Sequence, residues 1–277
     1  MNSSWPHLLE RRELLVELVW SDLRAQVVRR RLGALWWVAD PLLMMVVYWG
    51  VVVGLLGRGK TAYAPYPVYL LCALVTWKHL AKAAQRATGI LRQRESLIRS
   101  VPFPTAVLPV AEAASGLVLS LGGYLVVAVA SLLFPSPHHG GSLLPWVQVP
   151  LLLAFQLVAV TGICLLLACA GTLARDLEAV TSHLIRIGFY VSPGLFGLDL
   201  VRDELFTRLG PEAGAAALFG YLLNPFAILF TGYRDAFFYG RFLPLEHWLL
   251  LAGSSLGLLA VGYGVYRRHD DELVKRL

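Results

Sequence analysis

The sequence predicts an all-α integral membrane protein with six transmembrane helices, an N-terminal amphipathic interfacial helix, and re-entrant half-helices between spans five and six. Hydrophobic residues make up 57% of the 277 residues and charged residues only 15%, whereas soluble domains average about 45–50% and about 25%. Apolar runs of roughly 20 residues, the length that crosses a ~30 Å hydrocarbon core, recur along the chain. The basic residues lie between these runs, so they form no separate domain of the kind that binds nucleic acid.

Six apolar segments reach the length of a transmembrane helix. They cover residues 38–57, 66–83, 107–134, 147–171, 179–199 and 247–266. The flanking and connecting segments alternate in basic content, with seventeen Lys and Arg residues on one side and six on the other. Because Lys and Arg are retained on the cytoplasmic side, both termini are predicted to be cytoplasmic. Residues 1–31 carry both charge signs and no long apolar stretch, so we expect no signal peptide and a single transmembrane domain over 1–277.

Three segments outside the spans are also predicted to be helical. Residues 10–37 place Leu and Val on one face and charges on another, which is typical of a helix along the membrane interface. Asp40-Pro41 then resembles the start of the first span, because Asp can cap free amides and Pro fits the first turn. Residues 86–100 mix apolar and charged side chains, which indicates a short cytoplasmic helix. Within 205–240, two half-length apolar pieces meet at Asn224-Pro225, a pattern typical of re-entrant segments.

One motif has to be rejected on its context. The residues from Gly54 to Thr61 match the phosphate-binding pattern G-x-x-x-x-G-K-[ST], but such a loop joins a buried strand to a helix. Here an apolar helix precedes the motif and a proline-rich turn follows it, so no nucleotide site is predicted. We expect no metal or cofactor either, because the Cys and His residues lack ligands at metal-binding spacing. The residues concerned are Cys72, Cys164, Cys169, His79, His138 and His139.

Several short strings, each weak by itself, occur in a characteristic order from about residue 14 to 268. They are Leu32-Gly33 with Trp36, Pro41-Leu42-Leu43, Val101-Pro102-Phe103-Pro104, Leu108-Pro109, Arg175-Asp176, Ser192-Pro193, Asn224-Pro225 and Tyr233-Arg234-Asp235. Together they resemble the ABC-2 type permeases that export polysaccharides and teichoic acids. Two departures weaken any assignment of the polymer: Gln26-Val27 replaces the common Arg-Tyr pair, and Asp40 replaces the usual Asn or Gln.

The resemblance implies a transport subunit, not an enzyme, in a bacterial inner membrane. It further implies a homodimer bound to two copies of a separate cytoplasmic ATPase, with a lipid-linked polysaccharide of O-antigen, capsule or teichoic acid type exported between the two copies. One alternative is an ABC-2 exporter of a drug or small lipid. A more distant alternative is an intramembrane lipid-modifying enzyme, which would need converging acids or nucleophiles. The membrane-embedded acids amount to Asp40 and Glu112.

The 86–100 helix is predicted to couple this chain to its ATPase. Apolar anchors flanked by charges are what docking of a helix in a groove requires. Leu97 and Ile98 are the expected anchors, and Arg92, Glu95 and Arg99 are the expected polar contacts. The alternative is an ordinary loop whose basic residues reflect only its position on the cytoplasmic side of the membrane.

The substrate path is predicted from one cation and a set of aromatic residues. Arg186 lies inside the fifth span, where a charge is costly unless it faces a cavity or a partner. It is expected to contact the phosphate of a lipid-linked substrate, or else to snorkel or pair with a carboxylate such as Glu112. Aromatic rings could stack on sugars along the path, although membrane anchoring and helix packing are commoner uses. The candidates are Trp36, Trp37, Tyr48, Trp49, Trp77, Phe189 and Tyr190.

Overall fold

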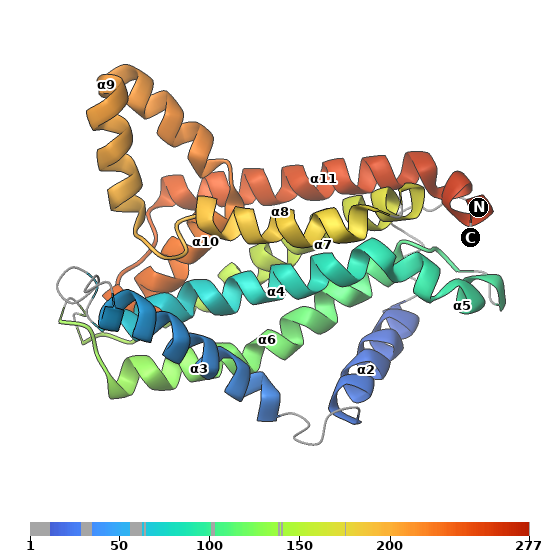
Figure 1. The fold of residues 1–277 in the computed structure, drawn as a ribbon, viewed down its shortest axis with the longest axis horizontal. Coiled ribbons are helices and arrows are strands. Elements are labelled where there is room, and N and C mark those ends of the chain that lie inside the picture. The colour runs from blue at the N-terminus through green and yellow to red at the C-terminus, as the bar shows by residue number, and fades with distance from the viewer. Residues whose placement is uncertain are drawn as a thin grey trace.

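The computed structural model describes residues 12–28, 35–55, 63, 65–100, 103–137, 139, 141–174 and 176–276, and this part of the chain is a bundle of helices without a strand (Figure 1). The helices are α2 (Arg12–Val28), α3 (Trp36–Trp49) with the π-helical η2 (Gly50–Leu55), α4 (Tyr66–Gln93), α5 (Glu95–Ser100), α6 (Val107–Leu133), the 3₁₀-helical η3 (Leu144–Gln148), α7 (Val149–Leu173), α8 (Leu177–Val191), α9 (Leu198–Leu222), α10 (Pro225–Arg234) with the π-helical η4 (Asp235–Tyr239), and α11 (Leu245–Arg276). The predicted fold class is therefore confirmed as all-α.

Helix α4 is the centre of the bundle. It packs against α3, α6, α7, α8 and α10, and it is buried on most sides from Tyr66 to Leu91. Small residues such as Ala83, Ala84 and Ala87 allow its neighbours to approach closely. With 28 residues it is about 42 Å long, so it extends well beyond a ~30 Å hydrocarbon core.

In the part of the chain that the structure describes, three helical segments are long and apolar enough to cross a membrane. They are Val107–Leu133, Leu144–Leu173 and Leu245–Asp270, and the pair α9 and α10, bent by 86°, would make a fourth if it is one broken span. Exposed leucines such as Leu125, Leu132 and Leu249 cover these segments, as expected for surfaces that face lipid. A multi-pass membrane protein follows. The spans predicted at 38–57, 66–83 and 179–199, and hence the total of six, stay predictions.

The two ends of the bundle carry different elements. Figure 1 shows α5 and the C-terminal end of α11 at one end, and α9 at the other. Helix α2 packs on α6, with Leu18 and Leu23 buried toward the bundle. Its position along a membrane interface, and the cytoplasmic side of the bundle, stay predictions.

Several helix boundaries differ from those expected. The predicted helix 10–37 is described as α2 and the start of α3, with residues 29–34 outside the described part. Helix α3 begins at Trp36, so Pro41 lies inside it and Asp40 is not its N-cap. The predicted 86–100 helix is divided at Arg94, because α4 continues through a run of good helix formers to Gln93.

The predicted re-entrant region has the expected break. Helix α9 reverses direction at Gly210, whose φ of 77° favours glycine, and Pro211 starts the second arm. The chain then bends at Asn224, whose side chain accepts a hydrogen bond from the Phe226 amide and so caps α10. Helix α10 and most of η4 are buried, so the second half of the region is a core element. Its depth in a membrane stays a prediction.

The crossing of α7 and α11 generates a first prediction. A Cβ added at Gly262 would overlap the backbone oxygen of Gly162, whereas one added at Gly257, on the same helix, would meet nothing within 4 Å. We expect Gly262→Val to force the helices apart and to cost about 3 kcal/mol of stability. Thermal unfolding of the purified protein in detergent measures this loss. The matched variant Gly257→Val should melt as the native chain does, and equal melting of both variants would show that the close approach of the two helices contributes little to stability.

Candidate functional site

A polar cluster lies in the centre of the bundle, and Gln156 of α7 connects it. The Gln156 Oε1 atom accepts hydrogen bonds from the hydroxyls of Tyr124 (2.6 Å) and Tyr233 (2.7 Å). Its Nε2 group donates to Nδ1 of His79 at 2.8 Å, which leaves the His79 Nε2–H to donate to the Ala113 carbonyl at 2.9 Å. These bonds assign a neutral imidazole and connect α4, α6, α7 and α10.

This cluster is built to hold helices together. Gln156, Tyr233 and His79 are almost fully buried, and each finds its partners within the protein. Interhelical hydrogen bonds of this kind stabilise membrane bundles. Because the ring and amide groups are occupied by one another, they are not positioned to act on a substrate.

Arg234 forms a second buried centre at the end of the bundle nearest α9. Its guanidinium donates to the carbonyls of Pro193 (2.6 Å), Gly194 (2.6 Å), Phe196 (3.0 Å) and Tyr69 (3.3 Å). It also lies 3.8 Å from the centre of the Tyr69 ring, a cation–π contact. One side chain therefore donates hydrogen bonds to the backbone carbonyls of the irregular turn between α8 and α9, which have no hydrogen bonds within a helix.

Three of the eight strings that carry the family resemblance meet at this centre. Asn224 donates to the Ser192 hydroxyl at 2.8 Å, and Arg234 binds the carbonyl next to that serine. Asp235 is buried and receives a hydrogen bond from Arg241 at 2.6 Å. The sequence identified Ser192-Pro193, Asn224-Pro225 and Tyr233-Arg234-Asp235 as separate markers. It contained no signal that Arg234 joins them.

A cavity of about 770 Å³ opens between α9, α10, η4 and the start of α11. Its lining combines aromatic rings, among them Phe206 and Tyr239, with charged groups such as Arg202 and Arg241. At its edge, Tyr63 donates to the Asp199 carboxylate at 3.2 Å. Burial, together with the negative charge of Asp199, raises the pKa of Tyr63 to about 12, so the phenol stays a donor.

The predicted coupling residues on α5 form two sets, one that packs inward on this chain and one that lies on the surface. Leu97 and Ile98 are half-buried and pack on the protein's own cluster around Ile90 and Phe103, so they are not free anchors. Glu95 and Arg99 form an ion pair of 2.9 Å with Arg99 largely exposed. The outward surface of α5 is therefore polar.

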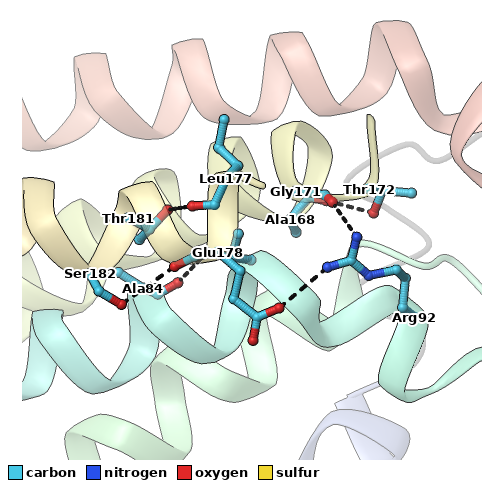
Figure 2. A network of polar contacts seen from close by, with 10 residues as sticks. Ala84, Arg92, Ala168, Gly171, Thr172, Leu177, Glu178, Thr181 and Ser182 are labelled. Carbon is cyan, nitrogen blue, oxygen red and sulfur yellow. Dashed lines mark hydrogen bonds and ion pairs between the residues drawn. The ribbon is translucent and has the colours of Figure 1, made fainter. Parts of the chain in front are cut away.

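Arg92 lies apart from the other coupling residues. Figure 2 shows its guanidinium reaching the α7–α8 corner, where it donates to the Gly171 carbonyl at 2.9 Å and to Glu178 at 3.5 Å. A Cβ at Gly171 would overlap the Thr88 carbonyl oxygen, so only glycine fits where α4 and α7 meet here. Arg92 thus connects α4 to the beginning of α8. The neighbouring Arg175 lies outside the described residues.

Helix α8 presents two parallel stripes on its exposed side. One stripe is apolar and the next is polar and aromatic. The apolar stripe holds Val180, Leu184, Ile187 and Val191, and the polar one holds Ala179, His183, Arg186 and Tyr190. Arg186 is exposed in this chain, and Glu112 pairs with Arg86 at 3.4 Å. The alternative in which Arg186 pairs with Glu112 is therefore wrong.

The aromatic candidates fall into four groups. Trp77 packs against Phe189, Phe226 and Phe230 with ring centres 5.6–6.1 Å apart, so Trp77 and the buried Phe189 belong to the helix packing. Trp36 is half-buried beside a cleft between α3, α4 and α6. The side chains of Trp37, Tyr48 and Trp49 lie outside the described part of the structure, as do most residues of the rejected nucleotide motif. Tyr190 is exposed.

No group of three His, Cys, Asp or Glu side chains able to hold a metal occurs among the residues that the structure describes. The three cysteines are buried and free.

The chain is similar over nearly its whole length to O-antigen export system permeases. It is 26% identical over 273 residues to the O-antigen export system permease protein RfbA of Myxococcus xanthus, covering 98% of this chain and 97% of the relative. Two proteins of the same description from Klebsiella pneumoniae are 24% and 22% identical, each over 92% of both chains. No protein-family model matches the chain. These relatives confirm the resemblance that the short strings indicated.

The Arg234 centre generates a second prediction. We expect Arg234→Lys to destabilise the protein by about 3 kcal/mol, because an ammonium group cannot span four carbonyls and leaves buried acceptors unsatisfied. Melting of the detergent-purified protein, followed by size-exclusion chromatography, measures the loss. Arg202→Lys, at an exposed position of the same cavity, is the matched control. A native melting temperature for Arg234→Lys would show that the carbonyl contacts contribute little.

Proposed function

We propose that this chain is an ABC-2 type permease of the polysaccharide-export family, the transmembrane subunit of an exporter that moves a lipid-linked glycan out of the cytoplasm. Two copies form the membrane part, and ATP hydrolysis on a separate cytoplasmic subunit drives transport. The chain acts as a transport subunit rather than an enzyme. The proposed location is the bacterial inner membrane with both termini cytoplasmic.

One observation carries this proposal: three relatives whose names describe O-antigen export permeases are similar to this chain almost from end to end. The structure supports it, because three of the eight strings that carry the resemblance, far apart in the sequence, meet at the Arg234 centre. Long apolar helices supply the membrane part. A polymer of O-antigen, capsule or teichoic acid type is the proposed cargo.

Helix α8 is the proposed wall of the path. A polar stripe on the exposed side of a predicted span is costly in lipid and needs water or a partner beside it. If the apolar stripe of Leu184 and Ile187 contacts lipid or the second copy, the stripe of His183, Arg186 and Tyr190 faces the space between the copies. Arg186 is then available to a phosphate, and Tyr190 to a sugar ring.

The end of the bundle that carries α5 is the proposed docking surface for the ATPase. Helix α5 extends beyond the membrane-length segments at the end opposite α9 (Figure 1). Its polar surface, with Glu95 and Arg99, suits a soluble partner, while Leu97 and Ile98 fix the helix to its own bundle.

The direct experiment is to tag the chain in its native host, extract it in mild detergent, and identify bound proteins by mass spectrometry. We expect a stoichiometric ATPase and ATP hydrolysis by the complex. An ATPase-free homomer would refute the exporter proposal.

A third prediction concerns the docking surface. Arg99→Glu places two acids one helical turn apart at an exposed site, so the fold loses only a few tenths of a kcal/mol. The reversed charge should nevertheless weaken retention of the ATPase about tenfold. Pull-down at several salt concentrations measures it, with Arg208→Glu as the matched control, because Arg208 forms an equivalent exposed pair with Glu204 on α9 at the opposite end of the bundle. If the two variants retain the partner equally, α5 is not the docking surface.

A fourth prediction concerns Arg186. Arg186→Ala should reduce surface glycan at least about tenfold, because a charge-assisted contact to phosphate is lost, while Arg186→Lys keeps a cation and retains most export. Immunoblotting of the surface glycan in cells that carry only the variant measures this. Leu184→Ala on the neighbouring stripe controls for loss of packing. Unchanged export by an assembled Arg186→Ala protein would remove Arg186 from the path.

A further inference from the structure

A cleft lies between α3, α4 and α6, in the half of the bundle nearer α2. It encloses a cavity of about 60 Å³, which is room for a group of the size of a phosphate. Charged and apolar side chains share its walls. The lining residues that matter are Asp40, Lys78, Lys82, Arg86, Glu112 and Trp36.

Three cations of α4 face this cleft at four-residue spacing, and only two carboxylates oppose them. A single oxygen of Asp40 lies 2.9 Å from the Lys78 ammonium and 3.3 Å from the Lys82 ammonium. Glu112 lies 3.4 Å from Arg86. One positive charge is therefore left without a counter-charge among the lining residues, within or near a predicted span, where an uncompensated charge is costly.

The Lys78 ammonium is also short of acceptors. Its nitrogen is shielded from solvent, and among the described residues the Asp40 carboxylate, at 2.9 Å, is its one close partner. An ammonium group carries three donors. A ligand that brings several acceptor oxygens and negative charge satisfies both deficits.

The opposite wall of the cleft, formed by α6, approaches α4 closely and carries no charge apart from Glu112. Gly116 and Gly123 of α6 lie where a Cβ would come within 2.9 Å of His79 and of Val75 respectively. The His79 Nε2 group is already bound to the Ala113 carbonyl, so the imidazole adds no charge to the cleft. Leu119 and Val75 make part of the wall apolar.

We propose that this cleft binds the phosphate group of the lipid that carries the exported glycan, with Lys78 and Lys82 as its contacts. The proposal rests on the proposed function and gives it a binding site. Lys78 lies five residues inside the predicted end of the second span, about 8 Å along the helix. A phosphate held there has left the headgroup layer, which favours one attached to a lipid chain over free phosphate.

Two variants test the site because they shift binding in opposite directions. Lys82→Gln removes the surplus charge and should weaken phosphate binding about tenfold. Asp40→Asn removes the competing carboxylate and should strengthen binding severalfold. A variant that merely damaged the fold would weaken binding in both cases. Arg267→Gln, an exposed loss of one positive charge on α11, is the matched control and should bind as the native chain does.

The full chain in phosphatidylcholine nanodiscs is titrated with farnesyl phosphate, with phosphatidylglycerol and with inorganic phosphate, and native mass spectrometry counts the ligand retained. Tight binding of farnesyl phosphate that weakens in Lys82→Gln and strengthens in Asp40→Asn supports the proposal. If phosphatidylglycerol binds as tightly, the cleft is a site for ordinary membrane lipid. If only inorganic phosphate binds, the cleft is not a lipid site. Either result overturns the proposal. Binding unaffected by either variant also overturns it.

Failure of this proposal is distinguishable from failure of the proposed function. The same native complex is tested for its ATPase and for glycan export. If ATPase and export are present while the cleft binds no farnesyl phosphate, the site is wrong and the exporter stands. If no ATPase or export is found, the exporter is wrong whatever the cleft binds.

Discussion

The guanidinium of Arg234 satisfies three backbone carbonyls of the non-helical turn between α8 and α9 as well as the Tyr69 carbonyl of α4, and much of the bundle depends on this. Non-helical backbone near the membrane interior is tolerated only when the protein itself fulfils its hydrogen bonds. By binding Pro193, Gly194 and Phe196, the arginine fixes the turn that follows α8 and allows α9 to project from the bundle. Its neighbour Tyr233 bonds to Gln156. Two consecutive residues of α10 thus connect the irregular end of the bundle to its central polar cluster.

Helix α8 is attached to the rest of the bundle near both of its ends. At its start, Glu178 receives Arg92 from α4, and beyond its end the chain is bound by Arg234. Between these points α8 packs mainly on α4 and leaves two stripes exposed. A helix fixed at both ends and open along its length is suited to form a wall, since it can present side chains without needing them for its own stability. Displacement of α4 would move both of its attachments together.

Local patterns predicted the helices, the break at Asn224-Pro225 and the family strings, because each is set by neighbours along the chain. They did not predict which arginine is buried. Arg186 lies in a long apolar run and is exposed on the surface of this chain, whereas Arg234 lies in a segment interrupted by proline and is almost fully buried. Hydropathy reports sequence neighbours, not the carbonyls that a turn about 40 residues away brings to a guanidinium. For the same reason, hydropathy did not predict that Leu97 and Ile98 pack inward on this chain.

In the half of the bundle nearer α2, basic residues that set the predicted membrane orientation also line the cleft. Lys78, Lys82 and Arg86 count toward the basic side of the membrane, but the continuous α4 also carries them along a wall of the cleft. There Asp40 and Glu112, the acids that an intramembrane enzyme would need, are each held by these cations. A carboxylate that is engaged in an ion pair is not free to take a proton from a substrate. Binding and movement of an anionic lipid suit this charge pattern better than catalysis does.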